Sequence, residues 1–220
     1  MPSPNAVEIA RVSRLYGNFA ALRDVSLSVP TGSSIVLLGE NGAGKSTLLK
    51  IIAGLATPTY GTVSVFGEKP LDVRHRLAYM SHATMLYDEL TALENLKYFA
   101  SLSPEPWTLD PRQALLDVGL DPTLPRRVAD YSQGMKQRAS LARVLLTNPD
   151  LLLLDEPFSN LDVASAAAMV ARLHAYLADP THTLILTTHQ AELAKPLATL
   201  ILTLQFGKVV SSTVPPMRSN

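Results

Sequence analysis

The chain has 220 residues, of which 47% are hydrophobic and 17% charged, so it can bury the core of one large α/β domain and is not expected to be disordered. Its 19 basic residues balance 19 acidic ones, and this zero net charge argues against a nucleic-acid-binding protein. The absence of cysteine excludes disulfides, iron–sulfur clusters and thiolate zinc sites.

The N-terminus lacks the features of a signal peptide, because residues 1–8 contain neither a basic start nor an apolar stretch. No window of about eighteen uninterrupted apolar residues occurs, so no membrane-spanning helix is expected. If the protein serves a transport process, the membrane-crossing part must be another chain.

Two segments near the N-terminus predict antiparallel strands. Hydrophobic residues alternate over residues 7–12 and through the second half of residues 21–29. A turn at residues 30–32 then leads to an apolar run at residues 34–38, which predicts a buried strand.

Residues 39–47 read GENGAGKST and complete the phosphate-loop pattern G-x-x-x-x-G-K-[ST]. The strand before the loop and a predicted helix at residues 46–53 supply the context that this motif requires. Inward-turned backbone N–H groups and the helix N-terminus favour an anion, Lys45 would reach the β- and γ-phosphates, and the Ser46 hydroxyl would ligate Mg²⁺. The alternative is an ordinary glycine-rich turn that happens to match.

Residues 83–135 combine a helical apolar period with several prolines, and this pattern predicts a small helical insert. A helix is expected at residues 91–100, with Thr91 and Glu94 in capping-box spacing. The following prolines leave room only for short helices such as residues 112–118. These prolines are Pro104, Pro106, Pro111, Pro122 and Pro125.

The segment 131–138 precedes a helix predicted at residues 139–146. Its Ser132 and Gly134 make the helix start a potential anion-binding end. By itself this pattern does not indicate a nucleotide.

The apolar run at residues 151–154 predicts a buried strand that ends in Asp155 and Glu156. Ligands bind outside the carboxyl ends of parallel strands, so both acids are expected beside the phosphate loop. Asp155 suits a Mg²⁺ partner that acts at least partly through water, and Glu156 suits a general base for the attacking water. The alternative is a solvated acidic pair at a strand end.

The α/β rhythm continues with an alanine-rich helix at residues 163–177 and a buried strand at residues 183–188. His189 follows this strand and could donate a hydrogen bond to a γ-phosphate, although a histidine at a strand end often has no special role. The tail beyond residue 211 contains two prolines and is expected to be loose.

With these motifs in this order, the chain resembles the ATP-binding subunits of ABC transporters over nearly its whole length. Residues 39–47 fit the Walker A motif and residues 151–156 fit Walker B with its catalytic glutamate. Residues 132–138 resemble the family signature in an S-Q-G-M variant, residues 159–162 fit the D-loop, and His189 fits the switch histidine.

Tyr16 stands where the family places the aromatic side chain that stacks on adenine; on stacking grounds alone it could also be a plain strand-end tyrosine. The resemblance assigns Lys45, Glu156 and His189 to catalysis, and Ser46 and Asp155 to Mg²⁺. The residues expected to contact the nucleotide are Tyr16, Gly39, Asn41, Gly42, Ala43, Gly44, Lys45, Ser46, Thr47, His82, Ser132, Gln133, Gly134 and Asp162.

The resemblance implies an α/β fold with a P-loop NTPase (RecA-like) core, an N-terminal antiparallel β subdomain and an inserted α-helical subdomain. One ABC ATP-binding domain is expected over residues 4–211, with the insert at about residues 83–135 and a flexible tail at residues 212–220.

His82 departs from the family pattern, which usually has a glutamine that touches Mg²⁺ at the start of the insert. Histidine can still form a hydrogen bond, but it mimics an amide oxygen poorly near Mg²⁺ and can titrate near neutral pH. His82 is therefore a candidate metal contact by its position only. Residues 82–96 are similar to the ATPase subunit of the haem exporter of cytochrome c maturation; a generic drug, lipid or polysaccharide exporter is the alternative.

The family implies ATP and Mg²⁺ as ligands, a head-to-tail dimer with a second copy or a paralogue, and a separate integral membrane subunit. It also implies a peripheral location at the cytoplasmic face of the bacterial cell membrane. A soluble P-loop kinase or ATPase is the non-transport alternative. Soluble ABC proteins of DNA repair or translation need a long coiled coil or two ATP modules, and the chain has neither.

Overall fold

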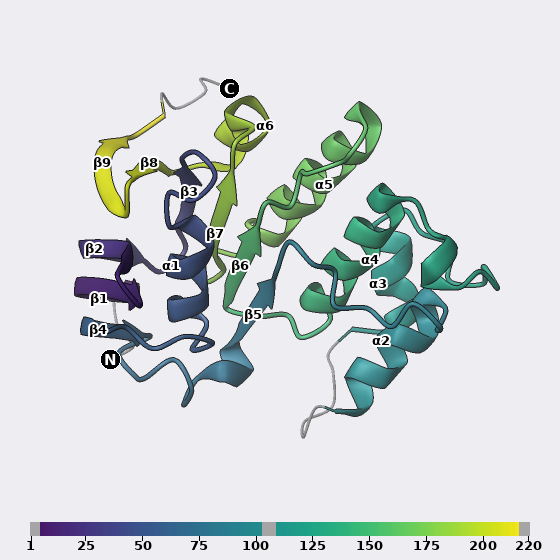
Figure 1. Cartoon of the computed structure of the whole chain (residues 1–220). Coiled ribbons are helices and arrows are strands. Elements are labelled where there is room, and N and C mark those ends of the chain that lie inside the picture. Colours follow the sequence, from purple (N-terminus) through teal and green to yellow (C-terminus); the bar gives the residue numbers. More distant parts are fainter. Residues whose placement is uncertain (1–4, 103–108, 216–220) are drawn as a thin grey trace.

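The computed structural model describes residues 5–102 and 109–215. A six-stranded sheet crosses the middle of the molecule, between a three-stranded antiparallel sheet and a lobe of helices (Figure 1). The strands are β1 (Asn5–Tyr16), β2 (Phe19–Pro30), β3 (Ser34–Leu38), β4 (Tyr60–Val65), β5 (Leu77–Met80), β6 (Leu151–Asp155), β7 (Thr183–Thr188), β8 (Leu200–Gln205) and β9 (Lys208–Thr213). The α-helices are α1 (Lys45–Ile52), α2 (Ala92–Ser101), α3 (Pro111–Asp117), α4 (Gln133–Leu145), α5 (Val163–Tyr176) and α6 (Ala191–Ala194).

The large sheet has the strand order β5-β6-β7-β3-β8-β9. Its strands pair in parallel, except that β8 and β9 pair antiparallel. The carboxyl ends of the parallel strands therefore meet at one edge of the sheet, which is where α/β proteins bind ligands.

The four leucines of β6 show how the sheet divides the core. Leu151 and Leu153 pack with α1 and the antiparallel sheet, whereas Leu152 and Leu154 pack with the helical lobe. Successive side chains of a strand point to opposite faces, and both faces of this sheet are covered. All four leucines are therefore fully buried, which explains why the sequence run is continuous rather than alternating.

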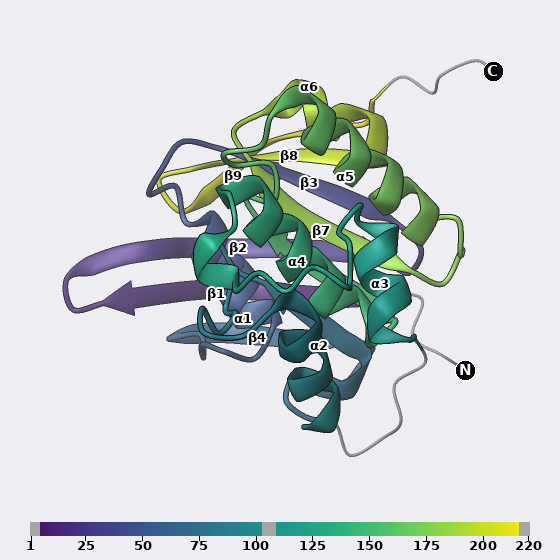
Figure 2. The ribbon, with the colours of Figure 1, turned by 90° about the vertical axis from the view of Figure 1, so that its right-hand side faces the viewer.

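The antiparallel sheet has β1 in its centre, paired with β2 and β4. A two-residue turn at Gly17 and Asn18 joins β1 to β2 and places Tyr16 opposite Phe19. Figure 2 shows this long hairpin extending beyond the rest of the molecule. The strands predicted near the N-terminus are confirmed, and they are longer than the alternating segments indicated.

The helical lobe confirms the predicted insert, including the capping box. The backbone N–H of Glu94 donates to Thr91 Oγ1 at 3.2 Å, and the Thr91 N–H donates to Glu94 Oε2 at 2.8 Å. Helix α3 starts at Pro111 with Asp110 as its N-cap, close to the predicted start at residue 112.

The start of α4 corrects the prediction of a helix at residues 139–146, because the helix already begins at Gln133. Ser132 is its N-cap, and the Ser132 Oγ accepts a hydrogen bond from the backbone N–H of Met135 at 3.2 Å. Gly134 weakens helix propensity, but the cap and the buried face of the helix outweigh that cost. The segment 133–138 therefore forms the first turns of the helix and does not precede it.

The C-terminus also differs from the prediction, since β9 continues to Thr213 and pairs with β8. Residues 212 and 213, which were expected to belong to a loose tail, are therefore part of this strand. Residues 216–220, Pro4, Pro104 and Pro106 lie outside the described residues. Within the described ranges, no helix combines the length and apolar character needed to cross a bilayer.

Candidate functional site

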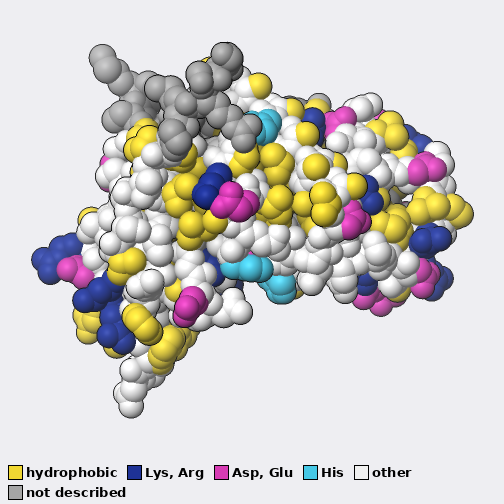
Figure 3. Space-filling model, turned by 90° about the horizontal axis from the view of Figure 1, so that it is seen from above, with side chains coloured by type: hydrophobic (Ala, Val, Ile, Leu, Met, Phe, Trp, Pro, Cys, Tyr) yellow, Lys and Arg dark blue, Asp and Glu magenta, His cyan; other side chains and the backbone are white. Residues whose placement is uncertain are grey.

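The parallel register brings three chemistry-bearing segments to one edge of the large sheet. Leu38 of β3 lies opposite Thr188 of β7, and Asp155 of β6 lies opposite Thr187. The residues that follow these strands, Gly39, Glu156 and His189, are therefore neighbours across the sheet edge. Figure 3 shows the molecule from above, with histidine side chains gathered near the middle of the view.

A cavity lies between the loop before α1 and the hairpin of the antiparallel sheet. Its lining residues are Tyr16, Phe19, Ala21, Glu40, Asn41, Gly42, Ala43, Gly44, Lys45, Ser46, Thr47 and Glu156. The predicted loop and the predicted aromatic side chain thus face one space.

Two glycines of the loop are required by the backbone. Gly39 has φ +153° and Gly44 has φ +107°. A Cβ atom at Gly39 would lie 2.4 Å from the Leu204 carbonyl oxygen, and one at Gly44 would lie 2.5 Å from the Ala21 carbonyl oxygen. Both positions therefore exclude a side chain, which keeps the loop tightly folded against its neighbours.

Lys45 is the first residue of α1, and its side chain is only 6% exposed. The Lys45 Nζ donates to the carbonyl oxygens of Gly39 at 2.7 Å and Glu40 at 3.2 Å. It also lies 3.4 Å from Oε1 of Glu156. These contacts hold the ammonium group beneath the loop, where an opposite charge compensates its burial.

Asp155 is buried, with 3% exposure, and accepts hydrogen bonds from three hydroxyl groups. Its Oδ1 accepts from Ser46 Oγ at 3.0 Å and from Thr187 Oγ1 at 2.7 Å. Its Oδ2 accepts from the Tyr79 hydroxyl at 3.4 Å. The carboxylate is thus held by side chains from α1, β7 and β5.

Glu156 follows β6 with a left-handed backbone, φ +53°. Its N–H donates to the Thr187 carbonyl oxygen at 3.1 Å and to Thr187 Oγ1 at 3.0 Å. The Glu156 Oε2 accepts from the His189 backbone N–H at 3.3 Å and lies 3.0 Å from His189 Nδ1. One carboxylate therefore contacts both Lys45 and His189.

The donor chemistry at this edge suits Mg²⁺. Ser46 and Asp155 present hydroxyl and carboxylate oxygens within 3.0 Å of each other. Mg²⁺ prefers oxygen ligands and is usually bound by one or two protein groups together with phosphates and water. Ser46 and Asp155 would hold the ion together with a phosphate ligand.

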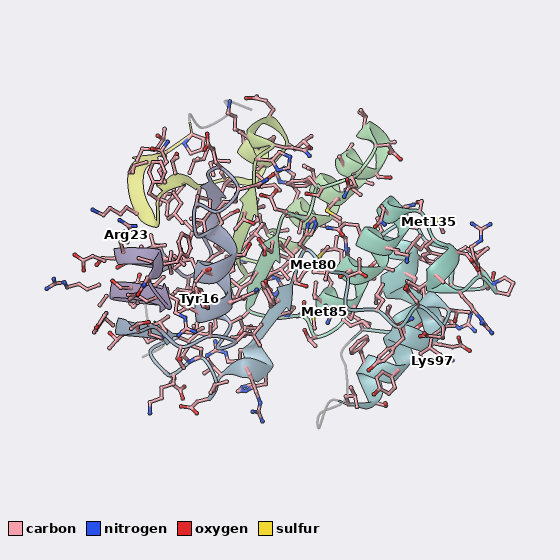
Figure 4. All side chains as sticks on the ribbon, in the orientation of Figure 1. Tyr16, Arg23, Met80, Met85, Lys97 and Met135 are labelled. Carbon is pink, nitrogen blue, oxygen red and sulfur yellow. The ribbon has the colours of Figure 1, made fainter. Side chains whose placement is uncertain are left out.

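The signature residues lie away from this cavity. Ser132, Gln133 and Gly134 open α4 in the helical lobe, and none of them is among the residues that line the cavity. Figure 4 labels Met135 of the same segment on the side of the molecule opposite Tyr16. The structure therefore does not bring the signature and the phosphate loop of one chain together.

Asp162 and His82 are also outside the cavity lining. Asp162 is the N-cap of α5, where its Oδ1 accepts from the Ser165 backbone N–H at 2.7 Å. This hydrogen bond is the main reason that the pKa of Asp162 is lowered. His82 is exposed just beyond β5, and among the described residues no hydrogen bond joins its ring to Ser46 or Asp155.

Sequence reasoning missed four residues of this site: Phe19, Tyr79, Gln137 and Thr187. Phe19 could have been found from its place opposite Tyr16 across a two-residue turn. Gln137 is buried on α4, and its Nε2 donates to the carbonyl oxygens of Glu156 at 3.4 Å and Pro157 at 3.3 Å. Tyr79 and Thr187 lie within strands, and only the register of the sheet places them beside Asp155.

Comparisons with known proteins agree with this geometry. The model of the ABC transporter family matches residues 22–159. The chain is 37% identical over 222 residues to the Nod factor export ATP-binding protein I of Rhizobium johnstonii, covering 97% of this chain and 70% of that protein. It is 36% identical over 225 residues to a phosphonates import ATP-binding protein of Rhodopseudomonas palustris, covering 94% of this chain and 79% of that protein. The dimeric structure of a bacterial ABC transporter cassette matches with a TM-score of 0.86 and 25% identity, covering 96% of this chain and 100% of that one.

These matches confirm the predicted P-loop NTPase core with its antiparallel β subdomain and helical insert. The names of these two relatives refer to Nod factor export and phosphonate import. They therefore do not support the more specific resemblance to a haem exporter. The chain belongs to the ABC transporter family as an ATP-binding subunit, and it is an ATPase that acts on ATP with Mg²⁺.

Proposed function

We propose that one chain forms half of an ATP site and that a second chain, in a head-to-tail dimer, completes it. The observation that carries this proposal is the separation of the cavity from Ser132, Gln133 and Gly134, the first residues of the signature, within one chain. Ser132 and Gln133 are exposed at the start of α4, so their side chains are available to another molecule. The N-terminus of that helix favours an anion such as the γ-phosphate. The match to a dimeric ABC cassette supports the same arrangement.

Within this dimer, Lys45 and the backbone of the phosphate loop bind the phosphates, and Ser46 and Asp155 hold Mg²⁺. Mg²⁺ supplies charge neutralisation at the phosphates when it is bound. Glu156 accepts a proton from the attacking water, and His189, in contact with the Glu156 carboxylate, donates a hydrogen bond to the γ-phosphate.

Other cavity residues position the nucleotide. Tyr16 stacks on the adenine base from the hairpin side of the cavity, and this residue is 47% exposed and open to such a contact. The remaining loop contacts come from Asn41, Gly42, Ala43 and Thr47. From the partner chain, Ser132, Gln133, Gly134 and Asp162 face the same nucleotide.

A mixing experiment tests the shared site. Lys45→Ala disables the phosphate loop, and Gly134→Asp places a charge and a bulky side chain in the signature. Neither variant alone should form an ATP-dependent dimer in light scattering, because every possible site is damaged. Their mixture should form one, since each mixed dimer contains one site built from two intact halves. A mixture that stays monomeric while wild type dimerises would contradict the shared site.

We also propose that the dimer couples its closure to a separate membrane subunit, at the cytoplasmic face of the cell membrane. The relatives are named as ATP-binding proteins of one export and one import system, which supports a transport role and leaves the direction open. A tagged chain expressed with its genomic neighbours should co-purify with an integral membrane protein from detergent extracts. Recovery only as a free chain would contradict the coupling.

Haem export for cytochrome c maturation is the finer hypothesis, and it depends on the resemblance of residues 82–96 alone. His82 lies at the start of the helical lobe, at the position from which closure would pass to a membrane subunit. Deletion of the gene should abolish covalent haem attachment to c-type cytochromes, detected by haem staining. Unchanged staining would leave the generic exporter as the better description.

A further inference from the structure

Thr187 is fully buried near the carboxyl end of β7, and its hydroxyl contacts both acidic residues of the site. The Thr187 Oγ1 donates to Asp155 Oδ1 at 2.7 Å. The same oxygen accepts the backbone N–H of Glu156 at 3.0 Å. A single hydroxyl group thus joins two consecutive residues of the neighbouring strand and uses its proton and a lone pair in doing so.

A second threonine of the same strand shows what a purely architectural contact looks like. Thr183 is also fully buried, but it lies at the opposite end of β7. Its Oγ1 accepts the backbone N–H of Gly32 at 3.0 Å, which ties a turn to the sheet. Within the described part of the chain, Thr183 forms no hydrogen bond with either acid. Thr183 therefore serves the fold, whereas Thr187 also contacts the site.

Tyr79 supports the carboxylate from the other side. Its hydroxyl donates to Asp155 Oδ2 at 3.4 Å, from β5. Together Thr187 and Tyr79 contact both carboxylate oxygens and oppose rotation of the group.

We propose that Thr187, assisted by Tyr79, is a positioning residue that orients Asp155 toward Mg²⁺ and fixes the backbone of Glu156. This inference rests on the proposed role of Asp155 as a Mg²⁺ partner. Groups that hydrogen-bond to a metal-binding carboxylate fix its orientation, and their loss weakens metal affinity. Glu156 has a left-handed backbone, which is strained for a residue other than glycine and persists only when its surroundings hold it. The hydrogen bond from the Glu156 N–H to the Thr187 hydroxyl is one of the contacts that hold it.

The test uses Thr187→Val, which removes the hydroxyl and keeps the side-chain shape. Affinity for a fluorescent ATP analogue is measured at increasing Mg²⁺ and again in EDTA. The Mg²⁺ concentration for half-maximal enhancement of binding should rise about tenfold. Affinity in EDTA should stay within about twofold of wild type, because the phosphate loop itself is unchanged.

Matched variants show whether the effect belongs to the hydroxyl. Thr187→Ser should return the Mg²⁺ dependence toward wild type. Thr183→Val removes an equally buried hydroxyl from the same strand and should lower the melting temperature without changing the Mg²⁺ dependence. Tyr79→Phe should raise the Mg²⁺ requirement less than Thr187→Val does, because its hydrogen bond is longer; it also tests the inference if Thr187→Val fails to fold.

Asp155→Asn separates the inference from the proposed function. If Asp155→Asn raises the Mg²⁺ requirement and the Thr187 and Tyr79 variants do not, the positioning role is wrong and the role of Asp155 stands. If Asp155→Asn has no effect, the proposed metal role is wrong and the inference is overturned with it. If Asp155→Asn and Thr187→Val each raise the Mg²⁺ requirement, the variant that carries both changes should need no more Mg²⁺ than Asp155→Asn alone. That result would show that Thr187 acts through Asp155.

Discussion

The Lys45 ammonium group lies 3.4 Å from a carboxylate oxygen of Glu156, so the proposed phosphate-binding cation and the proposed general base are in direct contact. Both side chains line the same cavity. A phosphate group that approaches Lys45 would therefore also approach Glu156. This contact yields separate expectations for the two residues.

Glu156→Gln should lower steady-state ATP hydrolysis by at least about 100-fold, because an amide cannot accept the proton of the attacking water. ATP binding should be largely retained, since Lys45 and the loop backbone remain. Phosphate release and equilibrium binding measure the two effects. Glu192→Gln, on an exposed glutamate of α6, is the control. Hydrolysis at the wild-type rate in Glu156→Gln would show that another group acts as the base.

Lys45→Ala should abolish measurable nucleotide binding, because it removes the charge that contacts the phosphates and leaves Glu156 without its partner. Binding of a fluorescent ATP analogue measures the loss. Lys50→Ala is the matched control, since Lys50 lies on the same helix and is exposed. Equal losses in both variants would mean that general charge, and not the position of Lys45, determines affinity.

Tyr16→Ala should weaken ATP affinity about fivefold or more, because base–aromatic stacking contributes roughly 1–3 kcal/mol. Tyr16→Phe keeps the ring and should bind normally. Phe19→Ala tests the second aromatic side chain of the cavity, which lies opposite Tyr16 in the hairpin. Tyr60→Ala removes another exposed tyrosine, on β4, as the control. If Tyr16→Ala binds like wild type, the ring does not contact the base.

The capping box of α2 predicts a pH effect on stability. The Thr91 backbone N–H donates to the Glu94 carboxylate and lowers the pKa of Glu94 below its ordinary value. A depressed pKa stabilises the fold above the pKa of the unfolded chain, about 4.3, and that stability is lost as the pH falls through the folded-state value. Wild type should therefore be more stable than Glu94→Gln at neutral pH, with the difference shrinking below about pH 4.

Urea unfolding of both proteins between pH 7 and pH 3 measures this difference. Glu89→Gln replaces an exposed glutamate near the same cap and serves as the comparison. A constant gap between wild type and Glu94→Gln at all pH values would place the contribution of Glu94 in packing and not in its charge.

Sequence patterns predicted the elements whose signals are local. The phosphate loop lies within nine consecutive residues, and the capping box of Thr91 and Glu94 spans four, so residues close together in the sequence determine both motifs. The strand at residues 183–188 is found at the same bounds because it is fully buried and apolar at its centre. The predicted start of α4 was wrong, because residues 133–138 contain a glycine and polar residues that do not indicate a helix by their pattern. The helix there is stabilised by its N-cap and its packing.

The sequence by itself determined that this protein has a phosphate loop, two acids at a strand end and an ABC-type order of motifs. Only the tertiary structure decided that Lys45 pairs with Glu156, and that Thr187, 32 residues from Asp155, donates to its carboxylate. It also decided that Ser132, Gln133 and Gly134 at the start of the signature lie away from the cavity. The physical reason is register: parallel strands distant in sequence bring their carboxyl ends together, and no local pattern encodes which side chains then meet.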